Sequence, residues 1–183
     1  MPRNYDYFFN RLWIIIQIQF TDAAMKYLVR NKLAFYSIIY KLECAAELFL
    51  LATSDWGIKN KEKHIIPVKK LPKLNFDSLK MDIIYLPEKL SCSILDLLIT
   101  YAKAEVAMEK VWDEDDPFNP EFYFTLRHLT SSVIGLKCLI VSKKIKKNYG
   151  IVIRSSSFVN QSTFSFLWEI RRHRRSEYLK FIR

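Results

Sequence analysis

Glycine is scarce in this sequence, with only 3 glycines among 183 residues. Phosphate-binding loops need several closely spaced glycines so that the backbone can approach the phosphate groups, and the sequence therefore excludes a Gly-rich nucleotide-binding motif. Cysteine is equally rare, and Cys44, Cys92 and Cys138 lie far apart. Three scattered thiols cannot form a disulfide framework. They favour an intracellular protein, either in the cytoplasm or inside an organelle.

Long uncharged hydrophobic runs are also missing. A membrane-spanning helix needs roughly 18 or more apolar residues, and the nearest candidate, residues 33–52, contains Lys41, Glu43 and Glu47. The apolar stretch at residues 12–20 is short and is interrupted by two glutamines, unlike a secretion signal. We therefore expect no transmembrane span and no secretion, while contact with a membrane surface stays open.

Residue patterns that would carry catalysis or bind a metal are not visible either. None of the three histidines follows an arginine at the spacing that helical ribonucleases of the HEPN type use. The carboxylate cluster Asp113 to Asp116 lacks the spacing of a calcium loop and is more typical of a solvated helix end. We therefore predict a non-enzymatic protein without catalytic residues, metal or cofactor. A helical nuclease acting as a defence effector is the least favoured alternative.

Hydrophobic residues are abundant enough for one buried core, because half of the chain is apolar. Apolar positions recur in steps of three and four over residues 93–112 and 122–147, which is the spacing of one helix face. Residues 5–31 and 32–54 also favour helix, and the second of these is apolar on almost all sides. We predict a mainly α, single-domain bundle of four to five helices, with residues 32–54 as its central helix.

Capping residues indicate where these helices begin and end. Ser93 is a favourable N-cap for the helix that the acidic cluster ends. Asn119 followed by Pro120 predicts the start of the next helix, with Asn as the cap and Pro at the first helical position. Gly150 predicts the end of that helix, and Gly57 the end of the helix over residues 32–54.

The C-terminal part of the chain predicts a further helix, from Thr163 or Ser165 onward, after a stretch at residues 151–158 that suits a strand. On this interpretation residues 1–162 form the helical core. Residues 163–183 form a basic amphipathic helix that belongs to the same domain or lies at its periphery.

A segment rich in proline and lysine interrupts the helical pattern at residues 58–90. Short strand candidates lie at residues 64–68 and 81–86, and we expect them to pair as a small hairpin or to remain extended. The lysines of this segment have two possible roles. They could contact phosphates, or they could prevent an exposed strand edge from pairing with another chain.

Positive charge is concentrated at the C-terminal end of the chain. The whole chain has a formal charge of +10, yet residues 1–140 hold 18 basic and 17 acidic side chains. Residues 141–183 hold 11 basic and 2 acidic side chains, whereas residues 81–121 hold 3 basic and 10 acidic ones. Any role for the net charge is therefore a role for the C-terminal segment.

The basic C-terminal segment predicts contact with phosphates, because arginine forks match phosphate geometry and Trp168 and Tyr178 add aromatic rings beside them. We expect an RNA-binding subunit or accessory factor of a ribonucleoprotein, since no DNA-binding helix motif is recognisable. The expected contacts are Arg171, Arg172, Arg174, Arg175, Lys143, Lys144, Lys146 and Lys147, with Lys69, Lys70 and Lys73 as a weaker group.

The same separation of charge has a second interpretation. The basic segment could dock on the acidic residues of its own chain or on an acidic partner protein, which would make the protein an assembly subunit. Protein partners within a complex are expected in either case.

Overall fold

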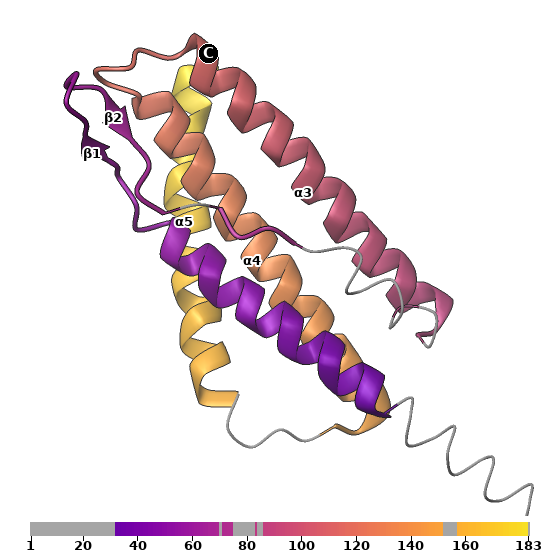
Figure 1. Ribbon diagram of the computed structural model, residues 1–183. Coiled ribbons are helices and arrows are strands. Elements are labelled where there is room, and N and C mark those ends of the chain that lie inside the picture. Colours follow the sequence, from indigo (N-terminus) through magenta and orange to yellow (C-terminus); the bar gives the residue numbers. More distant parts are fainter. Residues whose placement is uncertain (1–31, 70, 75–82, 84–85, 152–156, 183) are drawn as a thin grey trace, which may run out of the picture.

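Helices make up most of the protein in the computed structural model, which describes residues 32–69, 71–74, 83, 86–151 and 157–182 (Figure 1). One helix spans residues 32–52, and the other elements are β1 (Ile58–Lys59), β2 (Ile65–Ile66), α3 (Glu88–Glu114), α4 (Glu121–Tyr149) and α5 (Ser157–Phe181). The prediction of a mainly α bundle with a short hairpin is confirmed. The helix expected over residues 5–31 lies outside the described residues.

The helix α4 lies between α3 and α5 and packs against both (Figure 1). Of its predicted apolar face, Leu126 and Leu136 are buried, whereas Ile140 is 42% exposed. Its other side is buried too, although it carries polar residues such as Ser131 and Ser142. Burial of both sides makes α4 a central helix of the bundle, a position that its one-sided apolar pattern did not indicate.

A close approach of three helices is possible because residue 135 is glycine. A Cβ atom added there would lie 2.9 Å from Leu167 Cδ1 on α5 and 3.3 Å from Phe49 Cβ on the helix of residues 32–52. Leu167 and Phe49 are both fully buried. Gly135 therefore sits where α5 and the helix of residues 32–52 meet α4.

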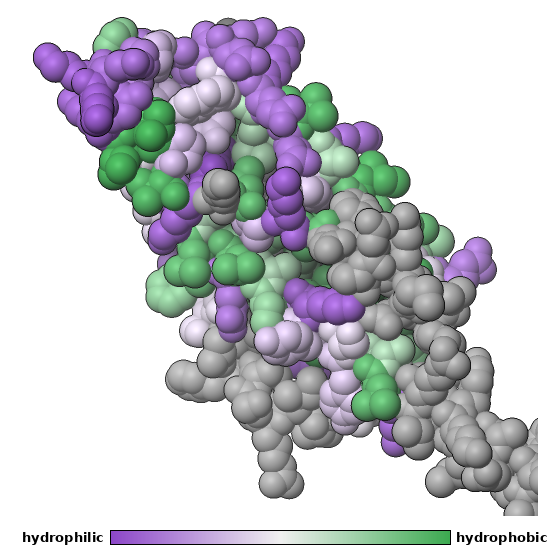
Figure 2. Space-filling model, in the orientation of Figure 1, coloured by the Kyte–Doolittle hydropathy of each residue, from purple (hydrophilic) through white to green (hydrophobic). Residues whose placement is uncertain are grey.

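The helix of residues 32–52 has a buried side and an exposed side. Ile38, Ile39 and Leu42 are fully buried, whereas Leu33 and Tyr40 are 65% and 70% exposed. Figure 2 shows this mixture of hydrophobic and hydrophilic side chains on one face of the molecule, with hydrophilic side chains gathered around the tip of the hairpin.

The helix α3 begins earlier than predicted. Pro87 occupies the N-cap position and Glu88 starts the helix, while the Ser93 hydroxyl donates to the Lys89 carbonyl inside it. Ser93 as N-cap is therefore wrong, because it lies inside the helix and its hydroxyl bonds to a carbonyl one turn earlier instead of to a free amide at the helix start. The predicted end in the acidic cluster is confirmed, since α3 ends at Glu114.

The acidic cluster joins α3 to α4. The Asp115 carboxylate accepts a hydrogen bond from the Tyr123 amide at 2.8 Å, and the Asp116 carboxylate accepts one from the Phe118 amide at 2.9 Å. Pro120, and not Asn119, is the N-cap of α4. The helix ends as predicted at Gly150, whose φ of 59° is left-handed.

The final helix begins at Ser157, which is earlier than the expected start at Thr163 or Ser165. Thr163 and Leu167 are buried, so α5 contributes to the core as well as to the surface. The strand expected at residues 151–158 falls partly on undescribed residues, and its last two residues are helical.

The hairpin pairs β1 with β2 in antiparallel register, Ile58 opposite Ile66 and Lys59 opposite Ile65. The strand candidate at residues 64–68 thus contains β2, whose partner among the described residues is β1, whereas the partner predicted at residues 81–86 falls largely outside the described residues. A partner nearer in the chain costs less loop-closure entropy, and the Asn60 side chain fixes the turn by accepting from the Glu62 and His64 amides.

We expected Gly57 to end the helix of residues 32–52, but it lies beyond that helix and shapes the entry to the hairpin. Its φ is 75°, and an added Cβ would lie 2.7 Å from the Ile66 carbonyl oxygen. The left-handed backbone and the close approach of β2 both require glycine here.

Candidate functional site

The predicted arginine cluster lies on α5, which runs antiparallel to α4. Leu167 packs near Gly135, and further along α5 the Tyr178 ring stacks on Phe122 near the start of α4, with centroids 5.8 Å apart. Arg174 lies between these two contacts. The arginines of α5 are therefore placed beside the N-terminal half of α4.

The four arginines of the cluster differ in their surroundings. Arg172 and Arg175 are exposed, and the Arg171 guanidinium lies over the Trp168 ring at 5.5 Å from its centroid. Arg174 pairs with Glu177 and covers the Trp56 ring at 4.5 Å. Arg174 thus holds α5 against the turn that precedes the hairpin, and the other three arginines form the available cationic surface.

The lysines near the end of α4 form a separate group. Lys143, Lys144 and Lys147 are exposed, whereas the Lys146 ammonium pairs with Glu43 at 2.5 Å. An α-helix rises about 1.5 Å per residue, so Lys144 lies roughly 24 Å along α4 from His128, beside which Arg174 is placed. The structure does not bring this group and the arginines of α5 into one patch.

The weaker lysine group is also placed elsewhere. The Lys69 ammonium donates to the Leu51 carbonyl at 3.3 Å and to the Ser54 hydroxyl at 3.1 Å. Lys73 is exposed on the rim of an open cavity of about 660 Å³, which Glu105 and Glu109 also line. Lys70 lies outside the described residues. The charge around Lys69 and Lys73 is therefore mixed.

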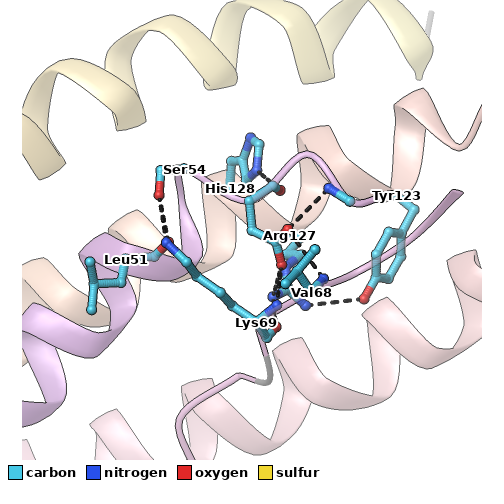
Figure 3. A network of polar contacts seen from close by, with 9 residues as sticks. Leu51, Ser54, Val68, Lys69, Tyr123, Arg127 and His128 are labelled. Carbon is cyan, nitrogen blue, oxygen red and sulfur yellow. Dashed lines mark hydrogen bonds and ion pairs between the residues drawn. The ribbon is translucent and has the colours of Figure 1, made fainter. Parts of the chain in front are cut away.

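A buried ion pair, part of the polar network in Figure 3, lies at the base of the hairpin, beside the segments that lead into β1 and out of β2. The Arg127 guanidinium donates from Nη2 to the Asp55 carboxylate at 3.1 Å and to the Lys69 carbonyl, and from Nη1 to the Tyr123 hydroxyl at 3.3 Å. The side chains of Arg127 and Asp55 are 2% and 3% exposed. This pair joins α4 to the segment after the helix of residues 32–52 and to the segment that follows β2.

Asp55 also holds the backbone of the hairpin. Its carboxylate accepts from the amides of Lys69 at 2.7 Å, Gly57 at 3.0 Å and Val68 at 3.3 Å. Burial alone would raise the pKa of this carboxyl, but the three amides and the Arg127 guanidinium outweigh burial and lower the pKa below its ordinary value. Asp55 is therefore charged and fully bonded inside the protein.

His128 is fully buried next to this pair. Its Nε2 donates to the Asp55 carbonyl at 2.8 Å, and its ring meets the Trp56 ring edge-on at a centroid distance of 4.6 Å. Burial lowers the pKa of His128, and the hydrogen bond to Asp55 opposes this shift only in part. A neutral imidazole without access to solvent is a structural group here.

The buried network was not predicted from the sequence. Asp55 and Arg127 are separated by 72 positions, and neither belongs to a local motif. Within the described residues, no group of three or more His, Cys, Asp or Glu side chains could hold a metal ion. Most of its polar groups are buried and bonded to one another, so the network stabilises the hairpin, although the buried Arg127 Nε and His128 Nδ1 have no hydrogen-bond partner among the described residues.

Exposed aromatic rings accompany the arginines on α5. Phe164, Phe166 and Trp168 are 39%, 57% and 53% exposed. The sequence analysis identified Trp168 but missed Phe164 and Phe166, because it placed neither residue on the apolar side or on the basic side of the helix. The Phe164 and Trp168 rings are nearly parallel, with an interplanar angle of 7° and centroids 6.5 Å apart.

The helix α4 is long and apolar enough to cross a membrane by length and composition, and 72% of its most apolar window is buried inside the protein. Core helices share these properties.

Comparison with known proteins gives no match to a protein-family model, to a curated protein or to a solved structure.

Proposed function

We propose that the protein binds nucleic acid, with RNA preferred, through the exposed side of α5. The observation that carries this proposal is the row formed by Trp168, Arg171 and Arg175, which recur in steps of three and four and so share one side of the helix. Arg172 borders the same row. Guanidinium groups next to aromatic rings are the combination that contacts phosphates and bases together.

The position of the acidic residues supports this proposal. The helix α3, which carries six of the fifteen acidic side chains of the described residues, lies on the other side of α4 from α5 (Figure 1). Among the described residues, no ion pair joins an arginine of α5 to an acid of α3, and Glu177 of α5 itself pairs with Arg174. Docking of the basic segment on the acids of its own chain therefore gains no support.

A salt series with matched variants tests the proposal. The protein, purified free of nucleic acid, is titrated against a labelled single-stranded RNA while anisotropy is recorded at salt concentrations from about 50 to 200 mM. One variant replaces Arg171, Arg172 and Arg175 by glutamine. The control variant replaces Lys143, Lys144 and Lys147 by glutamine, which removes the same charge at the other end of α4.

We expect the arginine variant to bind about 10-fold to 100-fold more weakly, since each exposed charge pair contributes up to about 1 kcal/mol. Its log–log salt slope should fall by about 2, because three phosphate contacts on a single strand are lost. The lysine control should keep most of the affinity. Equal losses in both variants, or no salt-dependent binding by the unmodified protein, would contradict the proposal.

Assembly with other protein chains is a second candidate function, and one observation favours it. The exposed side of the helix of residues 32–52 carries large hydrophobic side chains at helical spacing, a pattern typical of contact surfaces. These side chains are Leu33, Tyr36, Tyr40, Leu48 and Leu51. Sedimentation velocity without nucleic acid tests association between copies: we expect Tyr40→Ser with Leu48→Ser to dissociate it, and a monomer at all concentrations would contradict this candidate.

A further inference from the structure

The two sides of α5 that flank its buried side differ in charge. Positions four residues apart lie on the same side of a helix, whereas Phe166, two residues before Trp168, is turned by roughly 200°. Phe164, Trp168, Arg171 and Arg175 therefore share one side. Phe166 shares the other with His173 and Glu177, which lie 3.3 Å apart. One exposed side is aromatic and cationic, and the other carries an acid.

The parallel rings of Phe164 and Trp168 leave aromatic surface uncovered. Stacked planar groups lie about 3.4 Å apart, as bases do in a nucleic acid strand, whereas the centroids of these rings are 6.5 Å apart. The two rings are therefore either separated by about the thickness of one inserted base or displaced sideways so far that they barely overlap. In both arrangements each ring offers a face to a further planar group.

Charge continues the aromatic row toward the C-terminal end of α5. The Arg171 guanidinium lies 5.5 Å from the centre of the Trp168 ring, and Arg175 follows one turn later. The row from Phe164 to Arg175 extends over about 16 Å of helix axis. A ligand that contacts this whole row needs a planar group that is free to stack on the aromatic rings, next to a series of negative charges that face the arginines.

Building on the proposed function, we propose that the ligand of α5 is a single strand: an unpaired base stacks on the Phe164 and Trp168 rings, while Arg171 and Arg175 contact the adjoining phosphates. Duplexes fit this row poorly, because their bases are already paired and stacked and offer only the phosphates. Stacking on aromatic rings tolerates any base, so binding depends on strandedness far more than on sequence.

The experiment compares a labelled single-stranded RNA with a duplex of the same sequence, using the full chain and three alanine variants. Trp168→Ala and Phe164→Ala remove the stacking rings. Phe166→Ala is the matched control, because it removes an equally exposed ring from the other side of the same helix. Trp168→Phe keeps an aromatic face and serves as the rescue variant.

We expect the unmodified protein to prefer the single strand, and Trp168→Ala and Phe164→Ala to weaken that binding about tenfold or more each. The salt slope should stay unchanged in these variants, because the phosphate contacts remain. Phe166→Ala and Trp168→Phe should bind nearly normally, and indole fluorescence should be quenched by the single strand in the unmodified protein but much less in Trp168→Phe.

Two outcomes would overturn the inference, and they differ from failure of the proposed function. Equal affinity for single strand and duplex, with Trp168→Ala unchanged, would refute base stacking while leaving phosphate binding by α5 intact. Equal losses in Trp168→Ala and Phe166→Ala would show a general effect of aromatic removal and also refute it. If neither nucleic acid binds the unmodified protein, the proposed function and this inference fail together.

Discussion

The buried pair of Asp55 and Arg127 allows a quantitative prediction about stability. In Asp55→Asn, whichever way the amide is turned, its NH₂ group faces two hydrogen-bond donors. These are the amides of Gly57 and Val68 at one position, or the Lys69 amide and the Arg127 guanidinium at the other. The variant also leaves the Arg127 charge buried without its counter-ion. Breaking a buried pair in this way costs about 3–5 kcal/mol, a large part of the total stability of a typical domain.

A double-mutant cycle separates the pair from the rest of the network. Arg127→Met removes the guanidinium and leaves the Asp55 carboxylate with its three backbone amides. In the double variant the buried charge is gone and the asparagine amide faces fewer donors. We therefore expect the double variant to be more stable than the sum of the single losses predicts, by about 2 kcal/mol or more.

Urea unfolding followed by circular dichroism measures each corner of the cycle. Glu114→Gln is the matched control, because it neutralises an acid whose partner, Lys110, lies 3.8 Å away in an exposed pair. That change should cost less than about 0.5 kcal/mol. If Asp55→Asn loses no more than this control, or if the two single losses simply add, the assignment of Asp55 as the residue that holds the hairpin is refuted.

Three further predictions concern the hairpin entry, the buried imidazole and the contact of α5. Gly57 and Gly150 both have a left-handed backbone, but of these two only Gly57 has atoms within reach of an added Cβ, at 2.7 Å. Alanine should therefore lower the unfolding free energy by about 1–2 kcal/mol at Gly150 and by clearly more at Gly57. Urea unfolding measures both losses, and equal losses would contradict this reasoning. Burial holds the pKa of His128 below its ordinary value, so the unfolded chain binds the proton more readily and stability should fall as the pH drops below about 6.5. Unfolding measured at several pH values should show a smaller fall in stability for His128→Gln. The same pH dependence in both proteins would contradict this prediction. Arg174→Gln should lower the unfolding free energy by about 1–2 kcal/mol because its contact with an indole ring is lost, whereas the exposed Arg172→Gln should not, and similar melting of both variants would argue against a positioning role for Arg174.

The helices and the C-terminal ends of α3 and α4 were predictable because their signals are local, whereas the predicted starts of α3 and α5 were wrong. The apolar spacing of α3 placed Ile94, Leu98, Tyr101 and Met108 on the buried side, as the structure confirms. Gly150 ends α4 because a left-handed residue closes a helix without strain only when it lacks a Cβ. Such features depend on residues within one or two turns of one another, which a single sequence displays.

The buried polar side of α4 could not be predicted in the same way. Arg127 and His128 look like solvent-facing residues in the sequence, because charged side chains are seldom fully buried unless they are paired. Their partner, Asp55, lies 72 positions from Arg127, and no local pattern links the two. The pairing of β1 with β2 was missed for a related reason, since it depends on the turn that the Asn60 side chain fixes.

The candidate site was predicted in its composition but not in its arrangement. Counting charges identified the arginines of α5 and the lysines of α4 as one basic segment, because the two groups adjoin in the sequence. The antiparallel course of α5 along α4 moves the arginines away from those lysines and beside Trp56. The direction of a helix after a loop depends on tertiary packing, which charge counting does not contain.

The burial of α4 under α5 also matters during synthesis. The chain is made from its N-terminus, so α4 leaves the ribosome before the residues that cover Gly135 exist. Until Leu167 has been added, one side of a long, apolar helix has no partner of its own and remains open to solvent, to chaperones or to a second nascent chain. The helix α5 therefore closes this side of the core only after α4 has been made, and a chain shortened before α5 would leave that side of α4 exposed.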